Sequence, residues 1–236
     1  MRQNRPSFPP SVIPSRISTP GAYRRPYNLD DSCVLCLMPE AATKWIDQSG
    51  HNNNGTLSGA VFVDRGRRGP AMYFDGINDY VNITAATSFQ NPPALSIETW
   101  IYPTHIGGEN PIRTIARQQT GGSESFSMYF TNDVAGRINF VVFNNLMAWG
   151  LAYNLKCKPA NVWHHVVGTW NGLTIRLYVD GVIGTNGTRL GPVLGNQAFK
   201  LSDPNFPFKG LMDEFRYYKR ELKQPEITAL YMQGKP

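Results

Sequence analysis

The sequence has no long apolar run, few charged residues and only three cysteines. No apolar stretch approaches the roughly 18 residues that a membrane span needs, and the N-terminus MRQNRPSFPPSVIPSR has charge and proline where a signal peptide is apolar. We therefore expect neither a membrane-spanning protein nor an ordinarily secreted one, unless an upstream signal was removed. Three cysteines cannot all pair within one chain, and a domain of this size can build a core without disulfides, which favours synthesis in a reducing, intracellular compartment.

Acidic residues are absent from residues 1–28, and six prolines interrupt that segment. It contains five of the arginines and accounts for +5 of the formal net charge of +6, so the rest of the chain is close to neutral. Proline at this density prevents a regular helix, because each ring removes a backbone donor. The segment is predicted to be an extended N-terminal arm.

Two interpretations of the arm stay open. It is either a solvated, disordered leader or a segment that becomes ordered against a partner, with single apolar residues as anchors. The residues expected to contact such a partner are Arg2, Arg5, Phe8, Ile13, Arg16, Tyr23, Arg24 and Arg25. Protein is favoured over nucleic acid as the partner, because five arginines over 24 positions form too dilute a charge for strong phosphate binding.

From about residue 33, short apolar or alternating runs are separated by Gly, Asn, Asp and Pro, which is typical of strands and turns. Predicted strands cover 33–38, 56–63, 70–75, 79–84, 95–102, 112–118, 125–131, 137–143, 147–153, 162–170, 173–180, 198–202 and 209–218. Segments 162–170, 173–180 and 182–185 are expected to form a meander, and 224–232 a helix that caps the sheets. The pattern predicts an all-β, antiparallel sandwich or barrel.

Five motifs occur in one order: DQSGHNNNGTL, GPAMYFDGINDYVNI, LSIETWIYP, VWHHVVGTWNGLTIRLYVDG and GLMDEFRYYKRELKQPEITALY. Together they resemble the laminin-G-like, concanavalin A-like lectin-glucanase jelly-roll superfamily over roughly residues 30–232. The resemblance implies a two-sheet antiparallel β-sandwich with about six or seven strands in each sheet. We therefore expect an arm at 1–28 and a jelly-roll domain at 29–236.

Glycosidases share this architecture, so catalysis has to be considered. A retaining glycosidase needs two carboxylates about 5 Å apart, and the laminarinase-like relatives carry them in an E-x-D-x-x-E run. This sequence has no such run, and the neighbouring acids of Asp30-Asp31 and Asp213-Glu214 would point to opposite faces of a strand. Glu98 is a single acid on a predicted strand, interpreted as solvated or hydrogen-bonded. We expect no enzyme.

Metal binding has three candidate patterns. His164 and His165 are adjacent on a strand and cannot chelate one ion together, and the two-residue period of a strand should send Cys33 and Cys36 to opposite sides. The resemblance implies a structural Ca²⁺ held by Asp47 of the early loop and Asp213 of the late acidic pair. The alternative is that Asp and Asn in these loops serve as turn residues.

Trp149, Tyr153 and Phe206 lie near predicted loops, where a sugar can stack on an aromatic ring. They could equally be edges of the core or anchors for a second copy of the chain. The leading hypothesis is a non-enzymatic structural protein, most simply a capsid decoration or surface protein of a virion that docks onto a protein lattice through the arm. The alternative is a carbohydrate-binding module for adhesion or recognition, calcium-dependent or not, at an extracellular or cell-surface location.

Overall fold

The computed structural model describes residues 30–41, 44–64, 66–67, 69–106, 112–120, 123–131, 136–144, 146, 148–157 and 160–233. The arm at 1–28, with every partner-binding residue predicted in it, lies outside the described residues, so its role stays a prediction.

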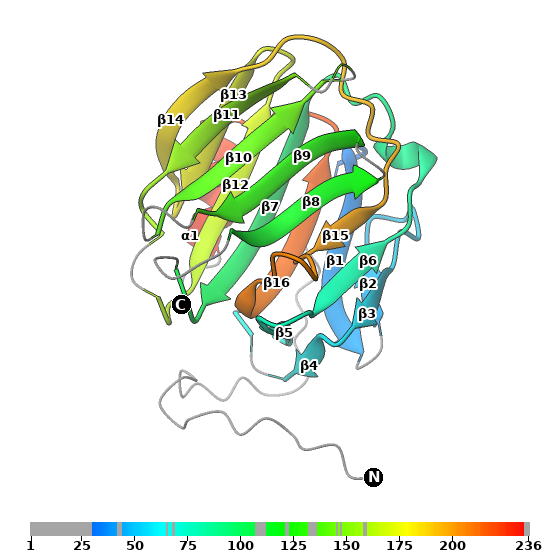
Figure 1. The fold of residues 1–236 in the computed structure, drawn as a ribbon, viewed down its shortest axis with the longest axis vertical. Coiled ribbons are helices and arrows are strands. Elements are labelled where there is room, and N and C mark those ends of the chain that lie inside the picture. The colour runs from blue at the N-terminus through cyan, green and yellow to red at the C-terminus, as the bar shows by residue number, and fades with distance from the viewer. Residues whose placement is uncertain are drawn as a thin grey trace.

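The described chain forms the predicted antiparallel β-sandwich with one C-terminal helix (Figure 1). Hydrogen bonds join the strands in one continuous order that folds over on itself and so produces two layers. We call the layer facing the viewer in Figure 1 the front sheet and the opposite layer the back sheet.

The front sheet runs, in spatial order, through β11 (Trp149–Asn154), β10 (Ile138–Phe143), β9 (Ser123–Phe130), β8 (Arg113–Thr120), β15 (Phe199–Leu201), β6 (Tyr80–Ile83) and β3 (Gly55–Ser58). The strand β2 (Lys44–Asp47) connects it to the back sheet, which continues through β1 (Cys33–Ala41), β16 (Lys209–Tyr218), β7 (Leu95–Pro103), β12 (His164–Trp170), β13 (Thr174–Val179) and β14 (Val182–Thr188). Beside this path, β5 (Ala71–Asp75) pairs with β16, and β4 (Val61–Val63) pairs with β5.

The main core lies between the two sheets, because alternate residues of each strand point inward. Phe126 of β9 and Phe140 of β10 face residues such as Ile175 and Phe215 of the back sheet. A Cβ atom on Gly168 of β12 would lie 2.6 Å from the Phe140 ring, so this ring fits only against a glycine.

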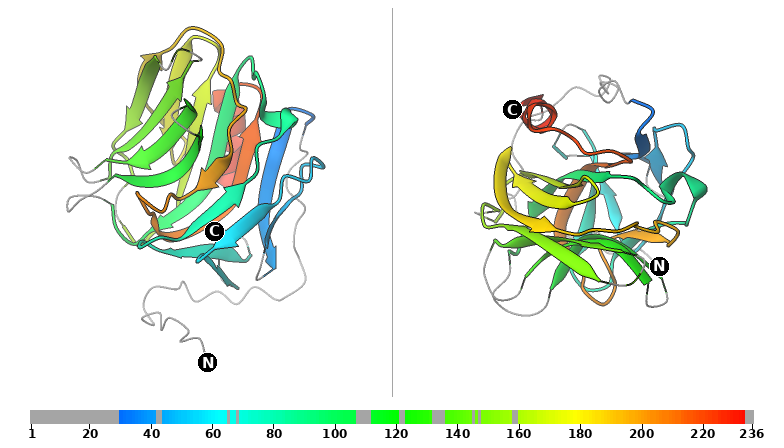
Figure 2. Two further views of the ribbon diagram at one scale, coloured as in Figure 1. Left: turned by 45° about the vertical axis from the view of Figure 1, so that its right-hand side comes forward. Right: turned by 90° about the horizontal axis from the view of Figure 1, so that it is seen from above.

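A second, smaller core covers the outer face of the back sheet under helix α1 (Gln224–Gln233). Ile227 of α1 and Leu222 pack on side chains from β1, β12 and β13. Tyr231 of α1 stacks on Trp100 of β7 and on His165 of β12, with ring centroids 6.0 and 6.2 Å apart. Figure 2 shows α1 on the outside of this sheet, which explains why β7 and β12 are buried on both faces.

The two strands that end this order, β11 and β14, approach each other along one side of the sandwich. The Thr185 hydroxyl accepts a hydrogen bond from the Tyr153 N–H at 3.0 Å and donates one to the Tyr153 carbonyl at 3.2 Å. A Cβ atom on Gly184 or Gly187 would lie 2.1 Å from a carbonyl oxygen of β11. The glycines of β14 therefore allow the two strands to approach closely. Along this contact between β11 and β14, called here the seam, the Thr185 hydroxyl makes the hydrogen bonds that a neighbouring strand's backbone would otherwise make.

Three local predictions differ from the structure. Strand β2 was not predicted, and the predicted strand 56–63 is divided into β3 and β4, because Gly59 has φ +79°. Cys33 and Cys36 lie in one cluster under α1 instead of on opposite sides. A register shift between Cys33 and Leu35 inserts Val34 as an extra residue, so this bulge reverses the alternation. Within the part of the chain that the structure describes, no helix is long and apolar enough to cross a membrane.

Candidate binding surface

The outer face of β9, β10 and β11 is the main candidate binding surface. Phe140 of β10 and Ala152 of β11 belong to the core, so the alternating neighbours Asn139 and Tyr153 point outward. The register places Tyr129, Asn139 and Tyr153 side by side on β9, β10 and β11. One row across the front sheet therefore holds two half-buried tyrosines with a buried asparagine between them.

Arg137, directly before β10, joins this row. Its guanidinium carbon lies 4.4 Å from the centre of the Tyr153 ring, and its Nε donates a 3.1 Å hydrogen bond to the Asn139 Oδ1 atom. The Asn139 Nδ2 atom donates in turn to the Tyr129 hydroxyl at 3.3 Å. These four side chains, called here the tyrosine cluster, form a connected set of donors, acceptors and ring faces.

The three residues predicted to bind a ligand are not equivalent. Trp149 begins β11, points outward on the same side as Tyr153, and is 61% exposed. Tyr153 is half-buried within the tyrosine cluster. Phe206 is half-buried at the other side of the sheet, where its carbonyl accepts a 2.8 Å hydrogen bond from Thr114 of β8. The structure brings Trp149 and Tyr153 onto one strand and leaves Phe206 apart, with β8, β9 and β10 between them.

Two carboxylates flank Arg117 of β8, that of Glu124, which is half-buried, and that of Asp203, which is buried. Its Nε lies 2.9 Å from Glu124 and its Nη1 lies 3.8 Å from Asp203, so one guanidinium serves both acids. Burial raises the pKa of Glu124, and Arg117 opposes that shift. Asp203 also accepts a 2.9 Å hydrogen bond from the Asn205 N–H, which fixes it as a turn residue. This arrangement neutralises the two carboxylates instead of leaving a pair free for acid–base chemistry.

A buried ionic network lies on the outer face of the back sheet, beneath α1. Glu98 of β7 is fully buried, with its Oε1 atom 2.7 Å from Arg216 of β16 and 3.0 Å from the His165 Nε2 atom. Glu214 completes the network at 3.3 Å from Arg216. Burial acts to raise the pKa of Glu98, but Arg216 and His165 outweigh it and lower the pKa to about 2. Sequence reasoning missed this network, because the three strands meet only through the sheet register.

The paired histidines have separate partners. His164 contacts the Asp180 carboxylate through its Nδ1 atom at 2.7 Å, whereas His165 contacts Glu98. Both are buried. Each histidine is therefore hydrogen-bonded to a different carboxylate, as expected for residues with a packed or hydrogen-bonded role.

The two residues proposed for calcium lie on different strands of the back-sheet region. Asp47 ends β2, Asp213 belongs to β16, and β1 runs between these strands. The Asp47 carboxylate accepts hydrogen bonds from the backbone N–H groups of Cys36, Ser49 and Asn53 at 2.8–2.9 Å. Asp213 accepts one from Arg67 at 2.9 Å. Across the described ranges no three His, Cys, Asp or Glu side chains gather as a metal site. The backbone contacts of Asp47 agree with the turn interpretation, and a calcium ion at Asp47 and Asp213 stays a prediction.

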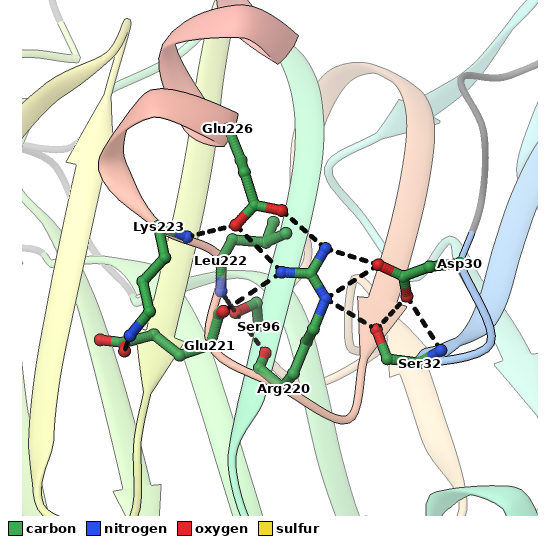
Figure 3. A network of polar contacts seen from close by, with 8 residues as sticks. All are labelled: Asp30, Ser32, Ser96, Arg220, Glu221, Leu222, Lys223 and Glu226. Carbon is green, nitrogen blue, oxygen red and sulfur yellow. Dashed lines mark hydrogen bonds and ion pairs between the residues drawn. The ribbon is translucent and has the colours of Figure 1, made fainter.

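Arg220, in the connection from β16 to α1, forms a polar junction with the first described residue (Figure 3). Its Nη2 atom lies 2.7 Å from the carboxylates of Asp30 and Glu226, and its Nε donates to the Ser32 hydroxyl at 3.0 Å. This hydrogen bonding lowers the pKa of Glu226. The junction fixes the position at which residues 1–29 join the domain, beside the start of α1.

Comparison with known families assigns this fold. Residues 75–228, more than half of the chain, match the laminin G model of the concanavalin A-like lectin/glucanases superfamily. The chain belongs to this superfamily, which confirms the family expected from the five motifs. No curated protein sequence matches the chain.

Several solved toxin domains share the fold. The receptor binding domain of a botulinum neurotoxin of mosaic serotype C/D is 17% identical with a TM-score of 0.70, and the match covers 86% of this chain and 51% of that one. The binding domain of Paraclostridial Mosquitocidal Protein 1 is 17% identical with a TM-score of 0.68, covering 85% and 52%. The receptor binding domain of botulinum neurotoxin D is 16% identical with a TM-score of 0.69, covering 86% and 53%. This chain thus spans about half the length of these structures, and identities this low establish the fold alone.

Proposed function

We propose that the domain is a non-enzymatic carbohydrate-binding module whose ligand lies on the outer face of β9, β10 and β11. The tyrosine cluster is the observation that carries this proposal. A sugar ring can stack on Tyr153 or Trp149, while Arg137 and the Tyr129 hydroxyl supply hydrogen bonds to its hydroxyl groups. Asn139 is buried and holds these two side chains in place. Arg137 already holds the Tyr153 ring, so little ordering of this side chain is needed when a ligand binds.

Two further facts support binding over turnover. The superfamily includes lectins, and the toxin structures that share this fold are named as binding or receptor binding domains. Two acids of the front-sheet region, Glu124 and Asp203, share Arg117. A glycosidase would need a carboxyl group that can give up its proton and a second that remains ionised and unpaired.

A glycan array probed with the full chain tests the proposal. We expect retention of at least one class of glycan, with a loss of about tenfold or more in Tyr153→Ala and Trp149→Ala. Tyr153→Phe is the matched control, because it keeps the stacking ring, and it should retain most of the binding. Silence across a broad array, or unchanged binding by Tyr153→Ala, would contradict the proposal.

We also propose, as a second function, that the arm at 1–28 attaches the domain to a repeated protein surface such as the capsid of a virion. The position of Asp30 supports this proposal, because Arg220 holds Asp30 beside the start of α1 (Figure 3). Helix α1 lies outside the back sheet (Figure 2), whereas the tyrosine cluster lies on the front sheet. An arm joined there can engage a lattice while the front sheet stays accessible. The location in a virion rests on the arginine- and proline-rich composition of the arm.

Deletion of residues 1–28 tests attachment. The truncated chain should keep the unfolding midpoint of the full chain but lose incorporation into particles when it is expressed during assembly. Arginine-to-lysine replacement at Arg2, Arg5, Arg16, Arg24 and Arg25 keeps the charge and separates guanidinium contacts from net charge. Normal incorporation of the truncated chain would refute the docking role.

A further inference from the structure

Large apolar side chains gather at the end of the sandwich where the connection from β14 crosses (upper end of Figure 1). Leu146 lies in the β10–β11 turn and is 80% exposed, Leu190 follows β14 and is 66% exposed, and Leu173 lies in the β12–β13 turn and is 47% exposed. Single exposed leucines are ordinary on protein surfaces, but three on adjoining loops are not. We call these residues the leucine tips.

Hydrogen bonds hold the leucine tips next to one another. The Asn144 side chain accepts the Leu146 N–H at 3.0 Å and donates to the Leu190 carbonyl at 3.3 Å, so it joins two of the loops. The Arg189 N–H donates to the Leu173 carbonyl at 2.7 Å, which attaches the third. These bonds join main-chain groups of the three leucines to one another's loops, so the leucine tips share one end of the sandwich.

We propose that the leucine tips insert into the lipid surface of a membrane that carries anionic headgroups. The site is separate from the tyrosine cluster, and the proposal goes beyond the proposed carbohydrate binding. Insertion removes three leucine side chains from water at once, and because the tips rise from separate loops they can enter between headgroups.

Area and charge favour lipid over a protein partner. A large aromatic side chain covers only about 150–250 Å², so three partly exposed leucines offer less than the roughly 800 Å² per partner of a stable protein interface. Two cations lie at this end of the sandwich: Arg189 directly precedes Leu190, and Lys219 follows β16, where it donates a 2.7 Å hydrogen bond to the Gln90 carbonyl. Glu221, which contacts the Asn171 side chain at the same end, is paired with Arg176 at 2.5 Å. Cations beside apolar tips suit an anionic lipid surface.

Co-flotation of the full chain with lipid vesicles tests the proposal. The vesicles are made of phosphatidylcholine alone or of phosphatidylcholine with about a third phosphatidylserine. We expect the wild-type chain to float with both, more strongly with phosphatidylserine, and the double variant Leu146→Ser with Leu190→Ser to partition at least about tenfold less into phosphatidylcholine vesicles. Ile77→Ser is the matched control, because Ile77 is 71% exposed in the β5–β6 turn and should not change partitioning.

The arginines of the arm could bind anionic vesicles by themselves, so the assay is repeated at about 0.5 M salt, which screens exposed charges. Binding that requires phosphatidylserine, disappears in salt and is unchanged in the double variant would assign the interaction to the arm and overturn the proposal. Failure of the wild-type chain to float with either vesicle would also overturn it. A dimer in light scattering that the double variant loses, without vesicle binding, would assign the tips to self-association instead. Glycan retention by the double variant, measured in parallel, keeps this result distinct from the test of carbohydrate binding.

Discussion

The buried network of Glu98 shows how one residue acts on the stability of the whole domain. Its carboxylate has left water completely and is compensated by Arg216 and His165. Removing one partner of a buried ion pair leaves the other without compensation, which costs about 3–5 kcal/mol. A pair at the surface, such as Arg220 with Glu226, contributes less than about 1 kcal/mol.

We predict that Glu98→Gln lowers the free energy of unfolding by about 3–5 kcal/mol near neutral pH, and that Glu226→Gln, the control, lowers it by less than about 1 kcal/mol. The pKa of Glu98 in the fold is about 2, below its ordinary value. Ionised Glu98 therefore stabilises the fold fully above the ordinary carboxyl pKa, and this stabilisation is lost as the pH falls toward about 2. Urea titrations at several pH values should show the gap between wild type and Glu98→Gln narrowing as the pH is lowered. A constant gap would contradict this assignment.

Asp47 is a second residue whose carboxylate is fully engaged, here by backbone donors of β1 and of the loop after β2. We predict that Asp47→Ala destabilises the domain by about 1–3 kcal/mol, because three buried or half-buried N–H groups lose their acceptor. Asp47→Asn, which keeps one carbonyl oxygen, should cost less. Thermal melts in calcium and in chelator should coincide for the wild-type chain. A higher melting temperature in calcium that Asp47→Ala abolishes would instead support the calcium site.

At the scale of the element, helix α1 covers the smaller core and keeps water from it. Ile227 and Tyr231 lie over Cys36 and His165, on a sheet face that would otherwise meet water. Burial raises the pKa of Cys36 to about 12 and that of Cys33 still higher, and it raises the pKa of Cys157 in the main core well above the usual value. Thiolate is the reactive form, so all three thiols should be inert while the fold is intact.

We predict that Ile227→Ala increases the rate at which Cys33 and Cys36 react with a thiol reagent, because α1 then separates more often from the sheet. Cys157 lies between the two sheets and should stay protected, which makes it an internal reference. Met232→Ala, on the exposed side of α1, should leave all three rates unchanged. Labelling sites and rates are read by mass spectrometry. Equal acceleration at Cys157 would show global destabilisation and contradict the local role of α1.

The sequence predicted the elements better than the contacts between them. Alternation in 173–180 and turn residues such as Asp180-Gly181 are local signals, so β13, its meander and α1 were predicted close to their observed bounds. Strand β2 was missed because its four residues, KWID, have no alternation long enough to recognise. The bulge at Val34 depends on how β1 meets β16, which no local pattern encodes.

The candidate site was predicted in part for the same reason. Trp149 and Tyr153 were identified because aromatic residues near predicted loops can be recognised from the sequence alone. Their partners Tyr129, Asn139 and Arg137 come from two other strands and become neighbours only through antiparallel register. Glu98, a single acid in the sequence, gains its arginine and histidine in the same way.

At the scale of the whole molecule, the seam between β11 and β14 determines whether the sandwich has open edges. Unpaired strand edges invite pairing with other chains. Thr185 satisfies both the N–H and the carbonyl of Tyr153, so one hydroxyl replaces part of a missing ladder.

We predict that Thr185→Val, which keeps the shape but removes the hydroxyl, lowers the free energy of unfolding by about 1–2 kcal/mol. Hydrogen exchange should accelerate at the Tyr153 amide before it does so at the amides in the centre of β10. Thr188→Val, an exposed position on the same strand, is the control and should change neither quantity. An unchanged exchange rate at Tyr153 in Thr185→Val would show that the seam does not depend on this hydroxyl.

The path of β1 has a mechanical consequence. β1 lies between β2 and β16 in the sheet, and Arg220 ties Asp30, just ahead of it, to the connection that leads into α1. Tension applied through the residues before Asp30 is directed along β1, so the ladders on both of its sides bear the load together, whereas an edge strand would peel away one bond at a time. A pulling force on that segment would thus load an interior strand in shear, and the domain should resist it better than it resists a force that peels an edge strand.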